Sequence, residues 1–127
     1  MPRRVLVVDD DRAIRRLVVE ILRADGLEPT DREDGSTALE YLTGGASVDL
    51  VLLDMRMPVM DGWQFASEVR RLAIDVPILV MTAASDARRW AREIAADGFV
   101  PKPFGVDELL TAVHEVLDRG ETVRSSS

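Results

Sequence analysis

The chain has 127 residues, no cysteine and a net charge of −7, a length that fills one ordinary domain and not two. An acidic chain repels phosphate backbones, which disfavours direct binding to nucleic acid, and the absence of cysteine excludes a disulfide framework or a thiolate metal site. No apolar run approaches the roughly 20 residues of a membrane helix, and the first run is too short for a signal peptide. We therefore expect a cytoplasmic protein with no membrane partner.

The first half of the sequence alternates short apolar runs with longer segments of helical spacing. The first run is β-branched and apolar, typical of a strand buried on both faces. Gly26 ends the first helix, and Pro29 places the second strand at a sheet edge because proline cannot donate to a strand ladder. The predicted elements are a strand at residues 4–8, a helix at 12–24, a strand at 27–31 and a helix that Asp34 and Gly35 open and Gly44 and Gly45 end.

The second half continues the alternation, so that strand and helix follow each other five times. This pattern predicts an α/β fold, a parallel sheet with helices on both faces. We expect one domain at residues 1–120 and a disordered polar tail at residues 121–127. The predicted elements are a strand at residues 50–53, a helix carrying Phe65 to Leu72, a strand at 78–81, a helix at 85–96, a strand at 98–101 and a helix from Val106 that Gly120 ends.

Polar residues able to do chemistry follow the predicted strands at the point where each strand ends. Asp9, Asp10 and Asp11 follow the first strand, Asp54 ends the third, Thr82 the fourth and Lys102 the fifth. In an open α/β sheet, ligands bind at the carboxyl ends of the strands, where the strand order reverses. The sequence therefore predicts that these side chains share one pocket.

A pocket that gathers Asp9, Asp10 and Asp54 holds more negative charge than Lys102 can cancel. Carboxylates at close range repel one another, and one of them can titrate abnormally high. Mg²⁺ suits such a pocket because it takes one or two carboxylates, keeps several waters and accepts phosphate oxygens. With no histidine or cysteine nearby, zinc and copper are disfavoured.

The same groups suit phosphoryl transfer. The transferred group spreads negative charge over its equatorial oxygens, and Mg²⁺, the Lys102 ammonium and the Thr82 hydroxyl can each stabilise that charge. Asp54 is then the nucleophile that forms an acyl phosphate. We predict this chemistry from the joint placement of the residues, because each residue alone also fits a plain structural role.

Several residues are expected to be structural. One of the three consecutive aspartates caps the first helix, as aspartate commonly does. His114 lies in the last helix, away from the strand ends, and we expect a surface or partly packed imidazole. Trp63 is expected to pack the third helix, whereas Trp90 fits a core position and an exposed partner face equally well. The arginine pairs at residues 15–16, 70–71 and 88–89 are interpreted as solvated helix faces.

Four segments together resemble the receiver domain of two-component response regulators, single-domain chemotaxis-type regulators included. The resemblance runs from about residue 4 to residue 118. It implies a flavodoxin-like, doubly wound sheet of five parallel strands in the order 2-1-3-4-5. This order puts the second strand at the edge, as Pro29 does. The segments are Val7-Val8-Asp9-Asp10-Asp11, Asp54-Met55-Arg56-Met57-Pro58-Val59-Met60-Asp61-Gly62, Met81-Thr82-Ala83 and Phe99-Val100-Pro101-Lys102-Pro103-Phe104.

The resemblance implies a role for each matching residue. Asp54 is implied as the phosphorylated aspartate, and Thr82 and Lys102 as the hydroxyl and the lysine that serve it. Phe99 is implied as the switch aromatic, which turns inward when Thr82 moves. Pro103 would follow Lys102 through a cis peptide bond.

The resemblance also implies the ligands of magnesium. Asp9 and Asp10 match the acidic pair that holds the ion, with Asp10 as the direct ligand, and the Asp54 carboxylate and the backbone carbonyl of Arg56 complete the set. Arg56 and Ala84 occupy two positions that tune the lifetime of the acyl phosphate in such domains. Our hypothesis is that Arg56 reaches over the phosphoryl group and hinders water.

Partners are implied as well. The phosphoryl donor is a sensor histidine kinase or a phosphotransfer protein, and a downstream protein binds the face formed by the fourth helix, fifth strand and fifth helix. Such a domain is not an enzyme beyond catalysing its own phosphorylation and dephosphorylation. The departures from the family pattern are small: Ala95-Ala96 stands where Gly-Ala is commoner, and Phe99 where tyrosine is frequent. Oligomeric state, and whether the chain acts alone or within a longer protein, stay open.

Three alternatives differ in testable ways. A magnesium phosphohydrolase of the haloacid-dehalogenase type needs a second acid two residues after the nucleophile, and this chain has Arg56 there. A flavodoxin-like cofactor binder needs a phosphate-cradling loop after the first strand, where the three aspartates would repel a phosphate. A degenerate receiver that is never phosphorylated would lack part of the residue set, which is intact in this sequence.

Overall fold

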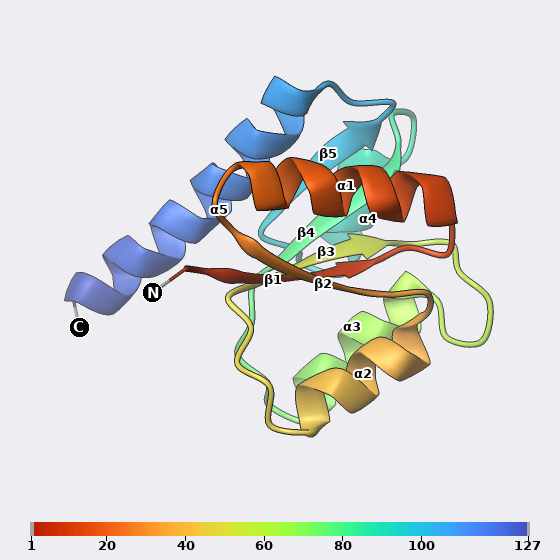
Figure 1. Ribbon diagram of the computed structural model, residues 1–127. Helices are drawn as coiled ribbons and strands as arrows, with labels where there is room; N and C mark the ends of the chain where they lie inside the picture. Colours follow the sequence, from red (N-terminus) through yellow and green to blue (C-terminus); the bar gives the residue numbers. More distant parts are fainter. Residues whose placement is uncertain (1, 127) are drawn as a thin grey trace.

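The computed structural model describes the backbone of residues 2–126 and the side chains of residues 2–119. Five strands alternate with five helices along the described chain (Figure 1), which confirms the predicted βα repeat. The strands are β1 (Arg4–Val8), β2 (Glu28–Arg32), β3 (Leu50–Asp54), β4 (Ile78–Ala83) and β5 (Gly98–Lys102). The helices are α1 (Arg12–Ala24), α2 (Gly35–Thr43), α3 (Gly62–Arg71), α4 (Ala87–Glu93) and α5 (Val106–Ser126).

The strands form one parallel sheet in the order β2-β1-β3-β4-β5, which confirms the predicted order. Pro29 lies in the edge strand β2, opposite Val5 of β1. An edge strand tolerates proline because one of its sides has no ladder to complete. The strand order reverses between β1 and β3, so the crevice outside their carboxyl ends is the place where a sheet of this type binds ligands.

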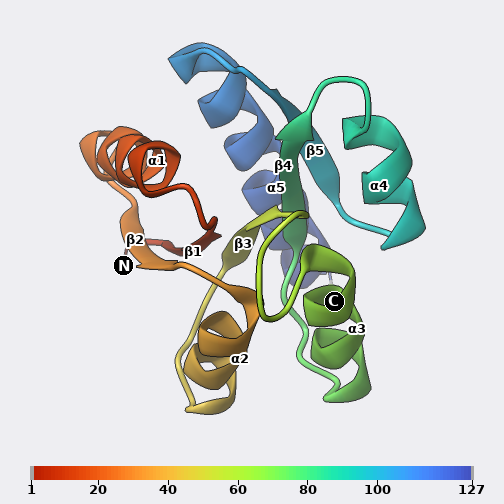
Figure 2. The same ribbon diagram turned by 90° about the vertical axis from the view of Figure 1, so that its right-hand side faces the viewer.

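Helices cover both faces of the sheet, with α1 and α5 on one face and α2, α3 and α4 on the other (Figure 2). Successive side chains of a strand point to opposite faces. In β1, Leu6 and Val8 accordingly pack toward α2, α3 and α4, while Val5 and Val7 pack toward α1 and α5. A strand between two helical layers is buried on both faces, which explains the apolar runs Val5–Val8 in β1 and Leu50–Leu53 in β3.

Aspartate side chains cap three of the helices. Asp11 caps α1, where its carboxylate accepts hydrogen bonds from the backbone N–H groups of Ala13 and Ile14. Asp34 caps α2, and Asp61 caps α3 in a reciprocal capping box. Each such cap contributes about 1 kcal/mol. The prediction that one of the three consecutive aspartates caps α1 is confirmed, and the cap is the third of them.

Two helices differ from their predicted lengths. The predicted helix at residues 85–96 is shorter, because α4 begins only at Ala87 and Ala95 adopts a positive φ of 50° directly after the helix. Gly120 does not end α5, which continues to Ser126. A glycine ends a helix by adopting the left-handed conformation, and among the described glycines only Gly26 and Gly45 do so. Whether residues 121–127 behave as a disordered tail stays a prediction, and Ser127 lies outside the described residues.

In the part of the chain that the structure describes, no helix is both long enough and apolar enough to cross a membrane.

Candidate functional site

Three carboxylates meet at the carboxyl ends of β1 and β3. Asp9 and Asp10 follow β1 and Asp54 ends β3, and one carboxylate oxygen from each lies within 4.8 Å of the others. Asp9 is fully buried and Asp54 is 7% exposed, whereas Asp10 is exposed. The structure therefore brings these residues together as the sequence predicted, with one carboxylate open to solvent. A set of close carboxylate oxygens suits an oxygen-preferring divalent cation such as Mg²⁺.

Lys102 supplies positive charge from the end of β5. Its Nζ lies 2.8 Å from Asp9 Oδ2 and 3.8 Å from Asp54 Oδ1. The other carboxylate oxygen of Asp9 accepts the backbone N–H of Asp11 at 2.9 Å. Asp9 is thus held from both sides, and Lys102 compensates Asp9 more closely than Asp54. The peptide bond that follows, Lys102–Pro103, is cis, as the resemblance implied.

Asp54 carries the clearest electrostatic perturbation of the site. Burial first, and then the neighbouring Asp9 carboxylate, raise the pKa of Asp54 to about 7. Lys102 and the backbone N–H of Arg56 act in the opposite direction but do not offset this rise in pKa. Near neutral pH the carboxyl group is therefore divided between its protonated and ionised forms. A cation bound beside it would favour the ionised form, which is the form that can act as a nucleophile.

Thr82 lies on β4, the strand next to that of Asp54, and Phe99 lies one strand further, on β5. Met81 of β4 is the register partner of Asp54, so Thr82 lies one residue beyond that level, and its side chain is buried. Phe99 of β5 is 37% exposed, and the guanidinium of Arg88 lies 5.9 Å from its ring centroid. Thr82 therefore lies at the same edge of the sheet as Asp54, and its hydrogen bond to a phosphoryl oxygen stays a prediction. The inward turn of Phe99 stays a prediction.

The loop between β3 and α3 packs directly against the site. Gly62 donates its backbone N–H to the carbonyl of Met55 at 2.9 Å. A Cβ at Gly62 would lie 2.7 Å from the Met55 Cα and 3.1 Å from the Asp54 carbonyl oxygen. Only glycine allows the first turn of α3 to approach the end of β3 so closely. This approach fixes the backbone of Arg56, whose carbonyl is a predicted metal ligand.

The side chain of Arg56 packs against a residue of α4. Its guanidinium lies 4.9 Å from the ring centroid of Trp90 in α4. The hypothesis that Arg56 reaches over the phosphoryl group and hinders water stays a prediction. Hydrophobic periodicity predicts helices and strands but not the direction of a side chain in a loop. The contact between Arg56 and Trp90 could therefore not be predicted from the sequence.

The two tryptophans lie together between α3 and α4. Trp90 is 5% exposed, which confirms the core interpretation and contradicts the exposed one. Trp63 packs edge-on against it, with ring centroids 4.9 Å apart, and donates its Nε1–H to Glu93 of α4 at 2.9 Å. Trp63 therefore joins α3 to α4 rather than packing α3 alone.

Arg15 is a residue of the site that the sequence missed. Its Nη1 donates to the backbone carbonyl of Asp9 at 2.8 Å, and its Nε pairs with Asp31 of β2 at 2.7 Å. Its side chain is only 14% exposed, so the interpretation of residues 15–16 as a solvated face is wrong for Arg15. The placement of Asp31 one strand away, at the carboxyl end of β2, is the feature that could have indicated this contact.

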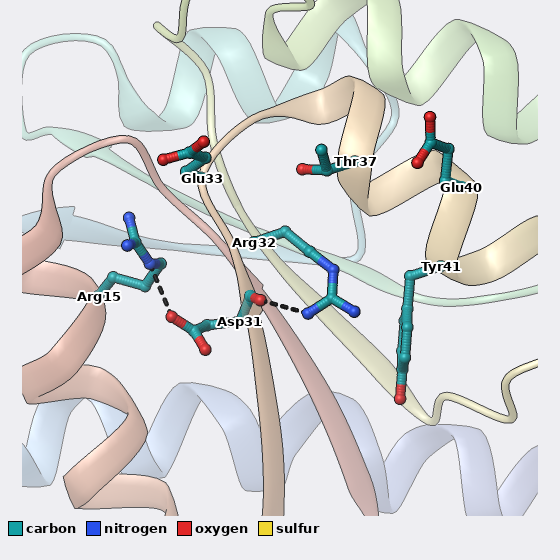
Figure 3. Close-up of a pocket in the computed structure, with 7 residues that line it drawn as sticks. All are labelled: Arg15, Asp31, Arg32, Glu33, Thr37, Glu40 and Tyr41. Carbon is teal, nitrogen blue, oxygen red and sulfur yellow. Dashed lines mark hydrogen bonds and ion pairs between the residues drawn. The ribbon is translucent and has the colours of Figure 1, made fainter.

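A hollow of about 550 Å³ lies beside the acidic cluster, between α1, the end of β2 and α2 (Figure 3). Arg15 and Asp31 form one wall, and the guanidinium of Arg32 lies 4.7 Å from the ring centroid of Tyr41 on the other. Arg32 also donates to the backbone carbonyl of Asp31 at 2.7 Å. The hollow thus has paired charges on its walls, and the candidate nucleophile Asp54 is not part of its lining.

His114 lies away from the site, as predicted. Its Nε2 is 2.6 Å from the carboxylate of Asp25, the residue that follows α1, and its side chain is 45% exposed. The expectation of a partly packed imidazole is confirmed. The contact joins α5 to the end of α1, on the face of the sheet opposite α3 and α4.

The family model of the response regulator receiver domain matches residues 5–114. The matched residues include Asp54, Thr82 and Lys102, which lie at the carboxyl ends of β3, β4 and β5. The chain belongs to the response regulator receiver domain family, and it is a receiver domain of two-component signalling. The phosphohydrolase and the flavin-binding alternatives find no support in this match.

Individual relatives agree with the family assignment. Over 121 residues the chain is 38% identical to the response regulator MprA of Mycobacterium sp. (strain KMS), covering 94% of this chain and 52% of that protein. It is 34% identical to the alkaline phosphatase synthesis transcriptional regulatory protein SphR of Synechococcus elongatus, covering 93% of this chain and 50% of that protein. The chain thus spans about half the length of these curated relatives.

Two solved structures show the same fold over almost the whole of their chains. The chemotaxis protein CheY4 of Vibrio cholerae superposes with a TM-score of 0.81 at 31% identity, covering 91% of this chain and 99% of that chain. A receiver domain of a Francisella response regulator superposes with a TM-score of 0.83 at 28% identity, covering 93% of this chain and 98% of that chain. The receiver fold is therefore found both as a whole chain and, in the curated relatives, as a part of longer proteins.

Proposed function

We propose that this domain is a phosphorylation switch in which Asp54 accepts a phosphoryl group from a phosphohistidine donor. The observation that carries the proposal is the meeting of three carboxylates within 4.8 Å, with the Lys102 ammonium 3.8 Å from the Asp54 carboxylate. Structural capping accounts for Asp11 but not for Asp9, Asp10 or Asp54. A buried carboxyl group with a raised pKa in such surroundings is a candidate for chemistry.

Mg²⁺ fits the donor set of the site. Asp9, Asp10 and Asp54 supply carboxylate oxygens, and the backbone carbonyl of Arg56 would complete the protein ligands. The exposed position of Asp10 suits a direct ligand, whereas Asp9 is committed to Lys102 and to the Asp11 backbone. When bound, the ion would supply the positive charge that favours the ionised form of Asp54 and balances the incoming phosphoryl oxygens.

The residues of the chain then have distinct tasks. An ionised oxygen of Asp54 attacks the phosphorus, the bond from phosphorus to the donor's imidazole nitrogen breaks, and that nitrogen takes up a proton from solvent. Lys102 pairs with one phosphoryl oxygen and the Thr82 hydroxyl donates to another. The added charge of about −1.5 to −2 draws both residues inward. The movement of Thr82 leaves the space that its side chain had occupied, and Phe99 turns into that space.

The partners follow from this chemistry. A sensor histidine kinase or a phosphotransfer protein is the donor, and a downstream protein reads the face formed by α4, β5 and α5. The domain is not an enzyme acting on other substrates, since it catalyses only its own phosphorylation and dephosphorylation. Its net charge of −7 argues against direct binding to nucleic acid.

The tryptophan pair provides a test of this function. Beryllofluoride, a phosphoryl mimic, is expected to change the tryptophan fluorescence in the presence of Mg²⁺, because Trp90 contacts Arg56 next to Asp54. The response should require both Mg²⁺ and beryllofluoride and be lost in Asp54→Asn. The exposed carboxylate Asp75 offers the matched control Asp75→Asn, which should respond as the wild type does. A beryllofluoride response that persists in Asp54→Asn would contradict the proposal.

A further inference from the structure

Arg56 has two connections that lead in different directions. Its backbone N–H hydrogen-bonds the Asp54 carboxylate and lowers the pKa of that group. Its side chain is exposed, and its guanidinium lies 4.9 Å from the ring centroid of Trp90. The backbone of Arg56 thus contacts the proposed phosphorylation site, whereas its guanidinium contacts Trp90 of α4.

The ring that receives this charge is held in place by its neighbours. Trp90 is buried, and the Trp63 ring packs edge-on against it at an interplanar angle of 68°. Trp63 is in turn fixed by its hydrogen bond to Glu93, one turn along α4 from Trp90. A ring fixed in this way presents a defined face to a cation, and a guanidinium within about 6 Å of a tryptophan face is attracted to it.

We propose that Trp90 is a positioning residue that sets the lifetime of the phosphoryl group on Asp54 by holding the Arg56 guanidinium away from it. The proposal rests on the function proposed above. A guanidinium has five N–H donors and pairs with phosphate oxygens in a bidentate manner. Released from Trp90, the Arg56 side chain would pair with the phosphoryl oxygens and cover the approach of water.

The reaction that this contact controls is hydrolysis of the acyl phosphate. A water oxygen attacks phosphorus, the bond from phosphorus to the Asp54 oxygen breaks, and the carboxylate is restored. Both protons of the water leave with the inorganic phosphate. The step needs an open path to phosphorus opposite the Asp54 oxygen, and that path is open while the guanidinium stays on Trp90.

Removal of the aromatic face is expected to prolong the phosphorylated state. In Trp90→Leu, loss of phosphate should slow by roughly two- to fivefold, the factor that corresponds to a cation–π contact at an exposed site. Trp90→Phe keeps an aromatic face and should lose phosphate at close to the wild-type rate. The measurement loads the protein with acetyl phosphate and Mg²⁺, removes the donor, and follows the phosphorylated mass with time.

A double-mutant cycle separates the Arg56 contact from a change in the packing of α4. In the Arg56→Ala background, Trp90→Leu should leave the rate of phosphate loss unchanged, because no guanidinium remains to be released. An equal slowing in both backgrounds, an acceleration, or no change in Trp90→Leu would each overturn the proposal.

A second readout does not depend on phosphorylation. In the unphosphorylated protein, the ring current of Trp90 should shift the Arg56 Nε–H resonance in NMR spectra, and the shift should disappear in Trp90→Leu but remain in Trp90→Phe. A wild-type protein that never gains a phosphoryl group would refute the proposed function itself. A wild-type protein that gains and loses one, with equal rates in all the Trp90 variants, would refute the role of Trp90 alone.

Discussion

Asp54→Asn is expected to stabilise the metal-free protein at pH 8 far more than at pH 5. The pKa of Asp54 is raised from 3.8 to about 7 in the folded protein, mainly by burial and by Asp9. Between these two values the folded protein binds a proton that the unfolded chain has released, so the free energy of unfolding falls as the pH rises through this window. Asparagine cannot ionise and does not take part in this loss.

The expected change is large for one side chain. The stability gained by Asp54→Asn over the wild type should grow by roughly 2–3 kcal/mol from pH 5 to pH 8, at about 1.4 kcal/mol for each pKa unit. Urea unfolding at several pH values in a chelator measures it, with Asp75→Asn as the control for removal of an exposed carboxylate. Excess Mg²⁺ at pH 8 should reduce the gain, because the cation favours the ionised Asp54. Parallel pH profiles for wild type and Asp54→Asn would contradict this account.

Lys102→Met is expected to destabilise the metal-free protein strongly at neutral pH. The substitution leaves Asp9, which is fully buried, without the ammonium that lies 2.8 Å from its carboxylate. Breaking a buried ion pair by removing one partner costs about 3–5 kcal/mol, because the other charge stays in a medium of low dielectric. Since the Lys102 side chain is 20% exposed, we expect a loss near 3 kcal/mol, the lower end of that range.

The cause of this loss can be tested by removing the second charge. Asp9→Asn combined with Lys102→Met should recover much of the stability, because the fully buried side chain closest to Lys102 then carries no charge. Chemical unfolding of the two single variants and the double variant in a chelator gives the coupling free energy. A cost below about 1 kcal/mol for Lys102→Met would show that the pair behaves like an ordinary surface ion pair.

The positions of the strand ends could be predicted from the sequence because they depend on backbone pattern alone. An apolar run buried on both faces, followed at once by Asp54 or Thr82, indicates both the strand and its end. Parallel pairing then brings the ends to one edge of the sheet, as the register of Asp54 with Met81 shows. Pro29 similarly indicated the edge strand, because the restriction on proline is a property of the backbone.

Side-chain directions outside the strands could not be predicted in this way. Arg56 lies in a loop, and its guanidinium is placed by Trp90, a residue distant in sequence. Arg15 looked like one of a solvated pair, yet it holds the Asp9 carbonyl and the Asp31 carboxylate. Both contacts depend on where a long side chain finds a partner across the fold. The length of α5 was missed for a local reason, since Gly120 does not adopt the positive φ by which glycine ends a helix.

The central claim is that Asp54 accepts a phosphoryl group, and the most direct measurement of it is intact mass after incubation with acetyl phosphate and Mg²⁺. The account predicts that the wild type and Asp75→Asn each gain one phosphoryl group, that peptide mapping places it on Asp54, and that Asp54→Asn gains none. A phosphoryl group on another residue, or a wild-type protein that gains none while remaining folded, would contradict the account.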